Sequence, residues 1–197
     1  GSAEIARTAG ARVVDVPVLG YGAALSGGFA AARGTICVMG DADATYPLEL
    51  LPQLIDPIRR GEADMVIGSR LRGATARTMP LLHRFVGTPV ITWLVRRAGG
   101  PRSLTDSQSG FRAFRRDELL GLNLRATGME YASEMLIVAG RANWRVEEIE
   151  TGYRQRIGAS KLEAWPDGFR HLTTILMLAP DLAATLPGAV VALIGSV

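Results

Sequence analysis

The sequence of 197 residues contains very little of three residue types. Its single cysteine, Cys37, excludes a disulfide bond within the chain and a thiolate metal cluster, and fits a reducing compartment. Its two histidines, His83 and His171, are too few for a histidine-rich metal site. A single lysine, Lys161, stands against 21 arginines, so this position is a candidate for function.

The excess of positive over negative charge in the sequence is also small. The 22 basic and 19 acidic side chains leave a net charge of +3, too little to indicate a nucleic-acid-binding protein. Hydrophobic residues make up 48% and charged residues 21% of the chain, which excludes a disordered or collagen-like protein. The length predicts one domain.

A long apolar run occurs only at the C-terminal end. Residues 1–10 are polar, charged and helix-like, unlike a signal peptide. Leu182–Val197 contains 16 residues without a charge, fewer than the roughly 20 apolar residues of a bilayer span. Two interpretations stay open: a buried core helix, or a membrane segment cut off by the end of the sequence.

Short apolar runs alternate with helical segments in the first third of the chain. This order is typical of an α/β fold with a mostly parallel sheet and crossover helices. We expect strands at 12–17, 35–39 and 63–67, and helices at 3–9, 20–34 and 47–60. Further on we expect helices at 81–97, 129–141 and 166–178, strands at 110–115 and 144–150, and loops at 69–79, 99–109 and 151–162.

An Asp-x-Asp pair, Asp41 and Asp43, directly follows the expected strand at 35–39. Ligands of open α/β sheets bind at the carboxyl ends of the strands. There, one carboxylate can hold a sugar or ribose hydroxyl while the other ligates a divalent cation through oxygen. The alternative is a solvated acidic turn. The strand before the pair and Pro47 opening a helix after it favour a functional site.

A glycine-rich turn competes with this interpretation. Gly20-Tyr-Gly-Ala-Ala-Leu25 opens a helix 21 residues before Asp41, as a dinucleotide fingerprint does. Leucine occupies the third glycine position, and the strand before the turn ends at Pro17. A dinucleotide site is therefore the weaker alternative, and close helix packing also accounts for these glycines.

Three further segments gather polar and charged groups. Asp106–Arg112 places an acid, hydroxyls and a guanidinium in one loop, although a simple turn has the same composition. Glu130 and Glu134 lie four residues apart on one helix face, directed at a site or at surface arginines. Arg154–Lys161 combines guanidiniums, a hydroxyl and the only lysine, which suits phosphate binding but also a solvated basic loop.

The chain resembles family 2 glycosyltransferases, most of all the polyprenyl (dolichyl) phosphate mannosyl- and glucosyltransferase branch. The resemblance runs from Ala3 to about Pro180, and it implies a GT-A-type, Rossmann-like, mostly parallel sheet flanked by helices. Its motifs come in order: Asp41-Ala-Asp43, Gly68-Ser-Arg70, Asp106-x-Gln-Ser-Gly-Phe-Arg112, Glu130 with Glu134, and Arg156-x-Gly-x-Ser-Lys161.

The chain departs from this family in two places. Family members begin with a strand carrying Pro-x-x-Asn-Glu and a second strand ending in an Asp-rich Gly-Ser turn, and this sequence starts after both. We therefore expect a fragment that lacks the first strand, with a partial catalytic domain at residues 1–180. Residues 181–197 form an apolar tail that can be the start of a membrane segment. Thr45 stands where mannosyltransferases of the branch often carry glutamine, which argues against mannose.

The resemblance implies inverting transfer of a sugar from a UDP- or GDP-sugar to a polyprenyl or dolichyl phosphate, with Mg²⁺ or Mn²⁺ as cofactor. It implies a place at the cytoplasmic face of a membrane and no nucleic-acid partner. A catalytically silent binding or assembly module stays open as the alternative. The implied roles are: catalytic, Asp43 and Asp106; metal, Asp41 and Asp43; donor, Asp41, Arg70, Arg112, Glu130 and Glu134; phosphate, Arg156, Ser160 and Lys161.

Overall fold

The computed structural model describes residues 1–71, 87–152, 154 and 164–182. The start of the helix expected at residue 81, most of the loops at 69–79 and 151–162, and the apolar end after Leu182 lie outside the described residues. The elements are α1 (Ser2–Thr8), α2 (Tyr21–Ala31), β1 (Ile36–Met39), η1 (Leu48–Leu50), α3 (Leu51–Arg59), β2 (Met65–Ser69), α4 (Thr88–Arg97), β3 (Arg112–Arg115), α5 (Arg116–Gly121), α6 (Tyr131–Arg141), β4 (Val146–Glu150) and α7 (Ala164–Leu178).

The strands form one mixed sheet in the order β1-β3-β2-β4. β4 runs parallel to β2, whereas β3 is antiparallel to both β1 and β2. Three of the four strands therefore point the same way, and the expected α/β class is confirmed. The insertion of β3 between β1 and β2 was not expected, because the alternation of strands and helices along the chain does not determine which strands become neighbours.

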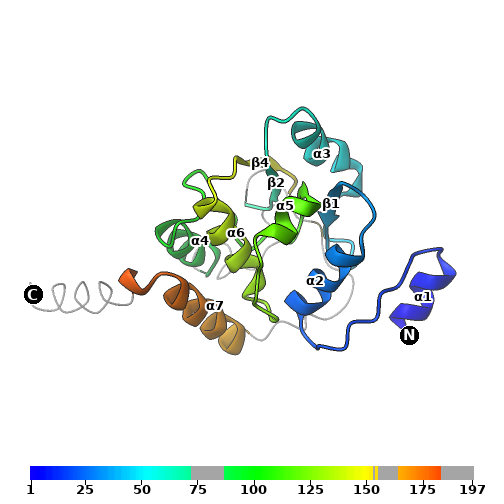
Figure 1. The fold of residues 1–197 in the computed structure, drawn as a ribbon, viewed down its shortest axis with the longest axis horizontal. Coiled ribbons are helices and arrows are strands. Elements are labelled where there is room, and N and C mark those ends of the chain that lie inside the picture. Colours follow the sequence, from blue (N-terminus) through cyan, green and yellow to red (C-terminus); the bar gives the residue numbers. More distant parts are fainter. Residues whose placement is uncertain (72–86, 153, 155–163, 183–197) are drawn as a thin grey trace, which may run out of the picture.

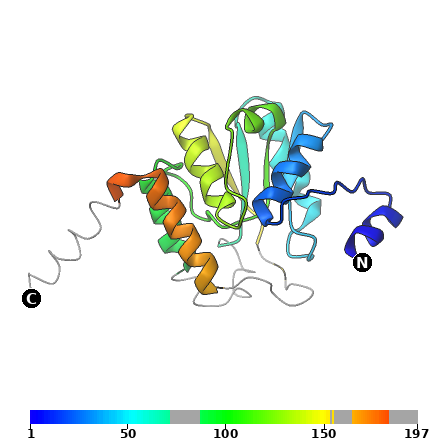
Figure 2. The same cartoon turned by 60° about the horizontal axis from the view of Figure 1, so that its bottom comes forward.

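Helices cover both faces of the sheet (Figures 1 and 2). On one face, Met65 and Ile67 of β2 belong to a large apolar cluster that also contains residues of α2, α4, α6 and α7. On the other face, Val66 packs in a smaller cluster with Leu54 and Ile58 of α3. Successive residues of a strand point to opposite faces, so the fully buried run of β2 supplies both clusters.

The strand expected at residues 12–17 is wrong. The structure has no strand there, and most of these side chains are exposed. Val16 instead lies against Gly27 of α2, at a place where a Cβ would clash with it. A β-branched run forms a strand only where a neighbouring strand offers hydrogen-bond partners, and none of the described strands pairs with this segment. The helix before it, α1, has no buried residue and stands away from the sheet in Figure 1.

Candidate active site at the carboxyl edge of the sheet

The antiparallel strand β3 brings four chain segments to one edge of the sheet. Arg112 at its beginning pairs with Met39 at the end of β1 and with Ile67 near the end of β2. The loop before β3 therefore meets the residues that follow β1 and β2. β4 ends at the same edge, because Glu150 pairs with Ser69. The Asp41-Ala-Asp43 motif and the Asp106–Arg112 motif, which are far apart in the sequence, therefore lie at the same edge.

The Asp-x-Asp pair lies in a turn with strained backbone. Ala44 has a φ of 63°, in the left-handed region that non-glycine residues rarely adopt. Asp43 is half-buried, and its Oδ1 accepts hydrogen bonds from Thr45 Oγ1 at 2.6 Å and from Thr45 N at 3.1 Å. Thr45 itself is buried. Thr45 therefore fixes the orientation of the Asp43 carboxylate. The sequence had shown only that threonine replaces a glutamine at this position, and did not predict this role.

Three oxygens converge on Gly110, next to the Asp-x-Asp turn. A Cβ at this position would lie 3.2 Å from Asp41 Oδ2 and 3.3 Å from the hydroxyls of Tyr21 and Tyr46. The Gly110 N–H donates to the Tyr46 hydroxyl at 2.8 Å, and the Tyr46 ring stacks on Phe111 at 5.1 Å. Burial, followed by the charge of Asp41, raises the pKa of Tyr21, so this phenol is neutral at pH 7. Tyr21 and Tyr46 are site residues that the motif analysis missed.

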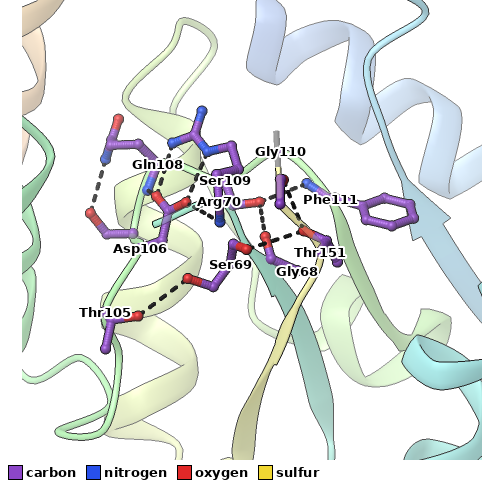
Figure 3. A network of polar contacts seen from close by, with 12 residues as sticks. Gly68, Ser69, Arg70, Thr105, Asp106, Gln108, Ser109, Gly110, Phe111 and Thr151 are labelled. Carbon is purple, nitrogen blue, oxygen red and sulfur yellow. Dashed lines mark hydrogen bonds and ion pairs between the residues drawn. The ribbon is translucent and has the colours of Figure 1, made fainter. Parts of the chain in front are cut away.

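Arg70 and Asp106 form a buried ion pair in the loop region next to Gly110 (Figure 3). Nε and Nη2 of Arg70 donate to the two carboxylate oxygens at 2.8 and 2.9 Å, and the Arg70 N–H donates to Oδ2 at 3.0 Å. Asp106 has no exposed surface. Burial alone raises the pKa of Asp106, but the charge and hydrogen bonds of Arg70 outweigh it and hold that pKa below its usual range. A carboxylate with a lowered pKa is a weak base, so the geometry favours a role for Asp106 in positioning Arg70.

A second carboxylate holds the turn on which Asp106 stands. Glu148 of β4 accepts hydrogen bonds from the backbone N–H groups of Thr105 and Asp106 and from the Thr105 hydroxyl, at 2.7–2.9 Å. Sequence analysis did not select Glu148. The signal that could have found it is the alternation of β4, which puts Glu148 on the same strand face as the half-buried Val146.

We expect Glu148→Gln to lower the free energy of unfolding by about 2 kcal/mol, because an amide NH₂ would face N–H donors that now bond a charged acceptor. Denaturant unfolding measures this change. Glu147→Gln is the matched control, since Glu147 is the exposed neighbour on the same strand. Equal stability of the Glu148 and Glu147 variants would contradict the assigned role.

Arg112, expected to bind the donor, is fully buried. Its guanidinium donates to the backbone carbonyls of Ser107 and Ser109 at 2.8 Å and of Ala132 at 2.9 Å. It therefore fastens the loop before β3 to α6. In this structure it has no surface with which to contact a donor, so the geometry gives it a positioning role.

Glu130 and Glu134, at the start of α6, also accept hydrogen bonds from backbone N–H groups. Glu134 accepts hydrogen bonds from the N–H groups of Arg125 and Ala126 at 2.8–3.1 Å. Glu130 Oε1 accepts from Gly128 N at 3.0 Å, whereas its buried Oε2 has no hydrogen-bond partner within the described part of the chain. Both carboxylates therefore shape the loop before α6, and Glu130 keeps an acceptor for a further donor.

The same loop closes the glycine-rich turn that resembled a dinucleotide site. The N–H groups of Gly22 and Ala23 donate to the carbonyls of Gly128 and Thr127 at 3.2 and 3.0 Å. A Cβ on Gly22 would lie 2.6 Å from the carbonyl of Ala126. A dinucleotide diphosphate needs such N–H groups at the helix N-terminus, so these glycines serve close packing and the dinucleotide alternative loses its basis.

The predicted phosphate-binding residues Arg156, Ser160 and Lys161 lie outside the described residues. The chain just before them is anchored near the Asp-x-Asp turn. The Arg154 N–H donates to the Thr45 carbonyl at 3.2 Å, and the Arg154 side chain pairs with Glu49. Arg154 therefore bonds the same residue, Thr45, that orients the carboxylate of the candidate metal ligand Asp43.

The carboxylates at this edge of the sheet fit a divalent cation only if the substrate supplies further ligands. Within residues 1–71, 87–152, 154 and 164–182, no three Asp, Glu, His or Cys side chains are grouped to hold a metal. Mg²⁺ is commonly bound through one or two carboxylates together with substrate phosphates. Asp41 and Asp43 match that requirement, so the residues fit a cation that is held jointly with a diphosphate.

The chain is similar to known glycosyltransferases. The family described as glycosyl transferase family 2 matches residues 1–120. The low-salt glycan biosynthesis hexosyltransferase Agl6 of Haloferax volcanii is 40% identical over 193 residues, 98% of this chain and 46% of that protein. A dolichyl-phosphate hexose transferase of the same organism is 35% identical over 84% of this chain and 70% of its own length. This chain thus spans about half of the first relative.

Solved structures agree with this match. Glucosyl-3-phosphoglycerate synthase from Mycobacterium tuberculosis, in complex with Mn²⁺, UDP and glucosyl-3-phosphoglycerate, superposes with a TM-score of 0.68 at 26% identity. The match covers 90% of this chain and 64% of that one. It confirms the expected GT-A-type arrangement. From the family match and the identity to Agl6 together, the chain belongs to glycosyl transferase family 2.

Proposed function

We propose that the whole protein transfers a sugar from a UDP- or GDP-sugar to a polyprenyl or dolichyl phosphate, with inversion at the anomeric carbon and dependence on Mg²⁺ or Mn²⁺. The observation that carries the proposal is the meeting of Asp41 and Asp43 with the Arg70–Asp106 pair at one sheet edge. The match to the hexosyltransferase Agl6, which covers 98% of this chain, supports hexose transfer, and the match to a dolichyl-phosphate hexose transferase supports the lipid acceptor.

Charge is the main difficulty of this reaction, because an anionic phosphate approaches while a diphosphate leaves. A divalent cation bound at Asp41 and Asp43 would offset the charge of the leaving diphosphate. Asp41 orients the donor sugar or ribose through its carboxylate. Arg70, held bidentately by Asp106, presents a fixed guanidinium to the donor side of the site.

The acceptor side is assigned to Arg156, Ser160 and Lys161. Their charges and hydroxyl hold the acceptor phosphate and reduce repulsion as the reactants meet. A phosphate monoester has a second pKa near 6 and is largely ionised at pH 7. It attacks without help from a strong base, which agrees with the lowered pKa of Asp106.

We propose further that the protein acts on its lipid acceptor at the cytoplasmic face of a membrane, with residues 1–180 as part of the catalytic domain and 181–197 as an apolar tail. The uncharged run from Leu182 to Val197 supports this proposal. Across the described stretches of the chain, none of the helices combines the length and apolarity that a membrane crossing needs.

The donor half of the proposal is tested by calorimetric titration of the chain with UDP-glucose and GDP-mannose, each with and without Mn²⁺. We expect one of them to bind, and only when Mn²⁺ is present. A folded chain that binds neither nucleotide sugar would instead support the silent binding or assembly module. Binding that ignores Mn²⁺ would contradict the proposed role of the Asp-x-Asp pair.

A further inference from the structure

A line of buried polar side chains crosses the core from α7 to the candidate active site. Nδ1 of His171 in α7 lies 2.9 Å from Oγ of Ser133 in α6. Nε2 of Gln108 donates to Ser133 Oγ at 3.4 Å and to Ser107 Oγ at 3.2 Å. Thr92 of α4 donates to Ser107 Oγ at 2.9 Å. Three helices are thereby tied to the loop that precedes β3.

These contacts lie where polar groups are costly. The side chains of His171, Ser133, Ser107 and Thr92 are all buried. A buried polar group destabilises the fold unless it is hydrogen-bonded, and a satisfied buried network selects one arrangement of the elements that carry it. The line therefore fixes how α7 and α6 sit against the loop.

Gln108 is the end of the line that reaches the site. It is partly exposed, and its backbone N–H donates to Asp106 Oδ1 at 3.2 Å. Figure 3 shows Gln108 next to the Arg70–Asp106 pair, and its carboxamide bonds Ser107, the residue that follows Asp106. The other end, His171, follows Lys161 by ten residues in the sequence. The line thus runs between the helix that follows the predicted phosphate-binding segment and the pair that positions Arg70.

We propose that His171 is a positioning residue for sugar transfer. Through Ser133 it holds the Gln108 carboxamide in place beside Asp106, and so keeps the loop and α7 in register during the reaction. This inference rests on the proposed function for its catalytic consequence. The link between His171 and Gln108 stands on the hydrogen bonds alone.

Loss of the imidazole then affects turnover more than donor binding. His171→Leu is expected to lower kcat for transfer to polyprenyl phosphate roughly tenfold, with little change in KM for the donor, since a hydrogen bond of this kind accounts for a factor of that order. His171→Asn, whose amide can replace Nδ1, restores most of kcat. In a Gln108→Leu background, His171→Leu has little further effect, because the two residues act through one contact chain.

A spectroscopic test does not depend on turnover. The chain has two histidines, so histidine labelled with ¹³C and ¹⁵N gives two sets of imidazole signals, which His83→Gln assigns. We expect Ser133→Ala and Gln108→Leu to shift the His171 signals. Met177→Ala is the control on α7, because Met177 is 82% exposed and should leave them unchanged. UDP and GDP, each with Mg²⁺, are then added to the wild type and to Gln108→Leu.

The outcomes separate the two proposals. A His171 signal that responds to the bound nucleotide in the wild type, and not in Gln108→Leu, supports the positioning role. Nucleotide binding without any response of His171, or unchanged His171 signals in Gln108→Leu, overturns it. If neither nucleotide binds, the proposed function falls, while the signals in Gln108→Leu still decide whether His171 is linked to Gln108. A His171→Asn variant with the low kcat of His171→Leu also overturns the positioning role.

Discussion

Asp106→Asn is expected to lower the free energy of unfolding by about 3 kcal/mol at pH 7 and to abolish most sugar transfer. The substitution removes the negative charge of Asp106 from beside the Arg70 guanidinium, whose side chain is only 14% exposed. Breaking a buried ion pair from one side is costly because the remaining charge is still out of water. Denaturant unfolding and a transfer assay measure the two effects.

The pH dependence follows from the direction of the Asp106 pKa shift. Because this pKa is lowered in the folded protein, the stabilisation is complete above the ordinary aspartate pKa of about 3.9 and is lost as the pH falls through the folded value. The stability difference between the wild type and Asp106→Asn should therefore be constant from about pH 5 to 7 and shrink below about pH 4.

The control for this prediction is Asp56→Ala. Asp56 pairs with Arg59 at 3.8 Å on the surface of α3, where the two side chains are 47% and 70% exposed. Such pairs contribute about 0–1 kcal/mol. If Asp106→Asn costs no more than Asp56→Ala, the Arg70–Asp106 pair does not stabilise the fold and its assigned role is wrong.

Asp43→Ala is expected to weaken Mn²⁺-dependent binding of the nucleotide sugar by about 100-fold or more, because it removes a proposed metal ligand. Thr45→Val should weaken it about tenfold, since it removes the hydrogen bond from Thr45 Oγ1 that orients the Asp43 carboxylate but keeps the one from the Thr45 N–H and both proposed metal ligands. Calorimetric titration with the same nucleotide sugar measures both.

The graded order of these two variants is the informative result. Thr45→Val removes only an orienting contact, so an effect equal to that of Asp43→Ala would mean that the turn as a whole has collapsed. Circular dichroism of each variant checks that case. Full Mn²⁺-dependent affinity in folded Asp43→Ala would contradict the assignment of Asp43 as a metal ligand.

The elements that could be predicted from the sequence are those set by local pattern. The apolar runs gave β1 and β2, and the glycine and proline signals placed α2 and α3 close to their observed bounds. The strand order could not be predicted, because β3 is joined to β1 and β2 by pairings across long stretches of chain. The strand expected at residues 12–17 failed for the related reason that a strand needs a partner.

In the candidate site, too, local sequence patterns could be predicted and long-range contacts could not. Asp41, Asp43 and Asp106 were selected as candidates from the motifs, because the spacing of such residues is visible in one segment. The pairing of Arg70 with Asp106 and the role of Glu148 could not be predicted from the motifs, because these contacts join residues 36 and 42 positions apart. Burial further separates residues that motifs treat alike: Arg70 faces the site, whereas Arg112 is enclosed.

Product formation with two phosphate acceptors distinguishes transfer to a lipid phosphate from transfer to a small phosphate. The whole protein is given the nucleotide sugar that it binds, Mn²⁺, and either a polyprenyl phosphate in detergent or 3-phosphoglycerate, whose glucosyl derivative is bound in the solved structure of the mycobacterial synthase. Our account predicts a sugar-linked polyprenyl phosphate, recovered in the organic phase, and no product with phosphoglycerate. Transfer to phosphoglycerate alone, or to neither acceptor by a protein that binds the donor, would contradict it.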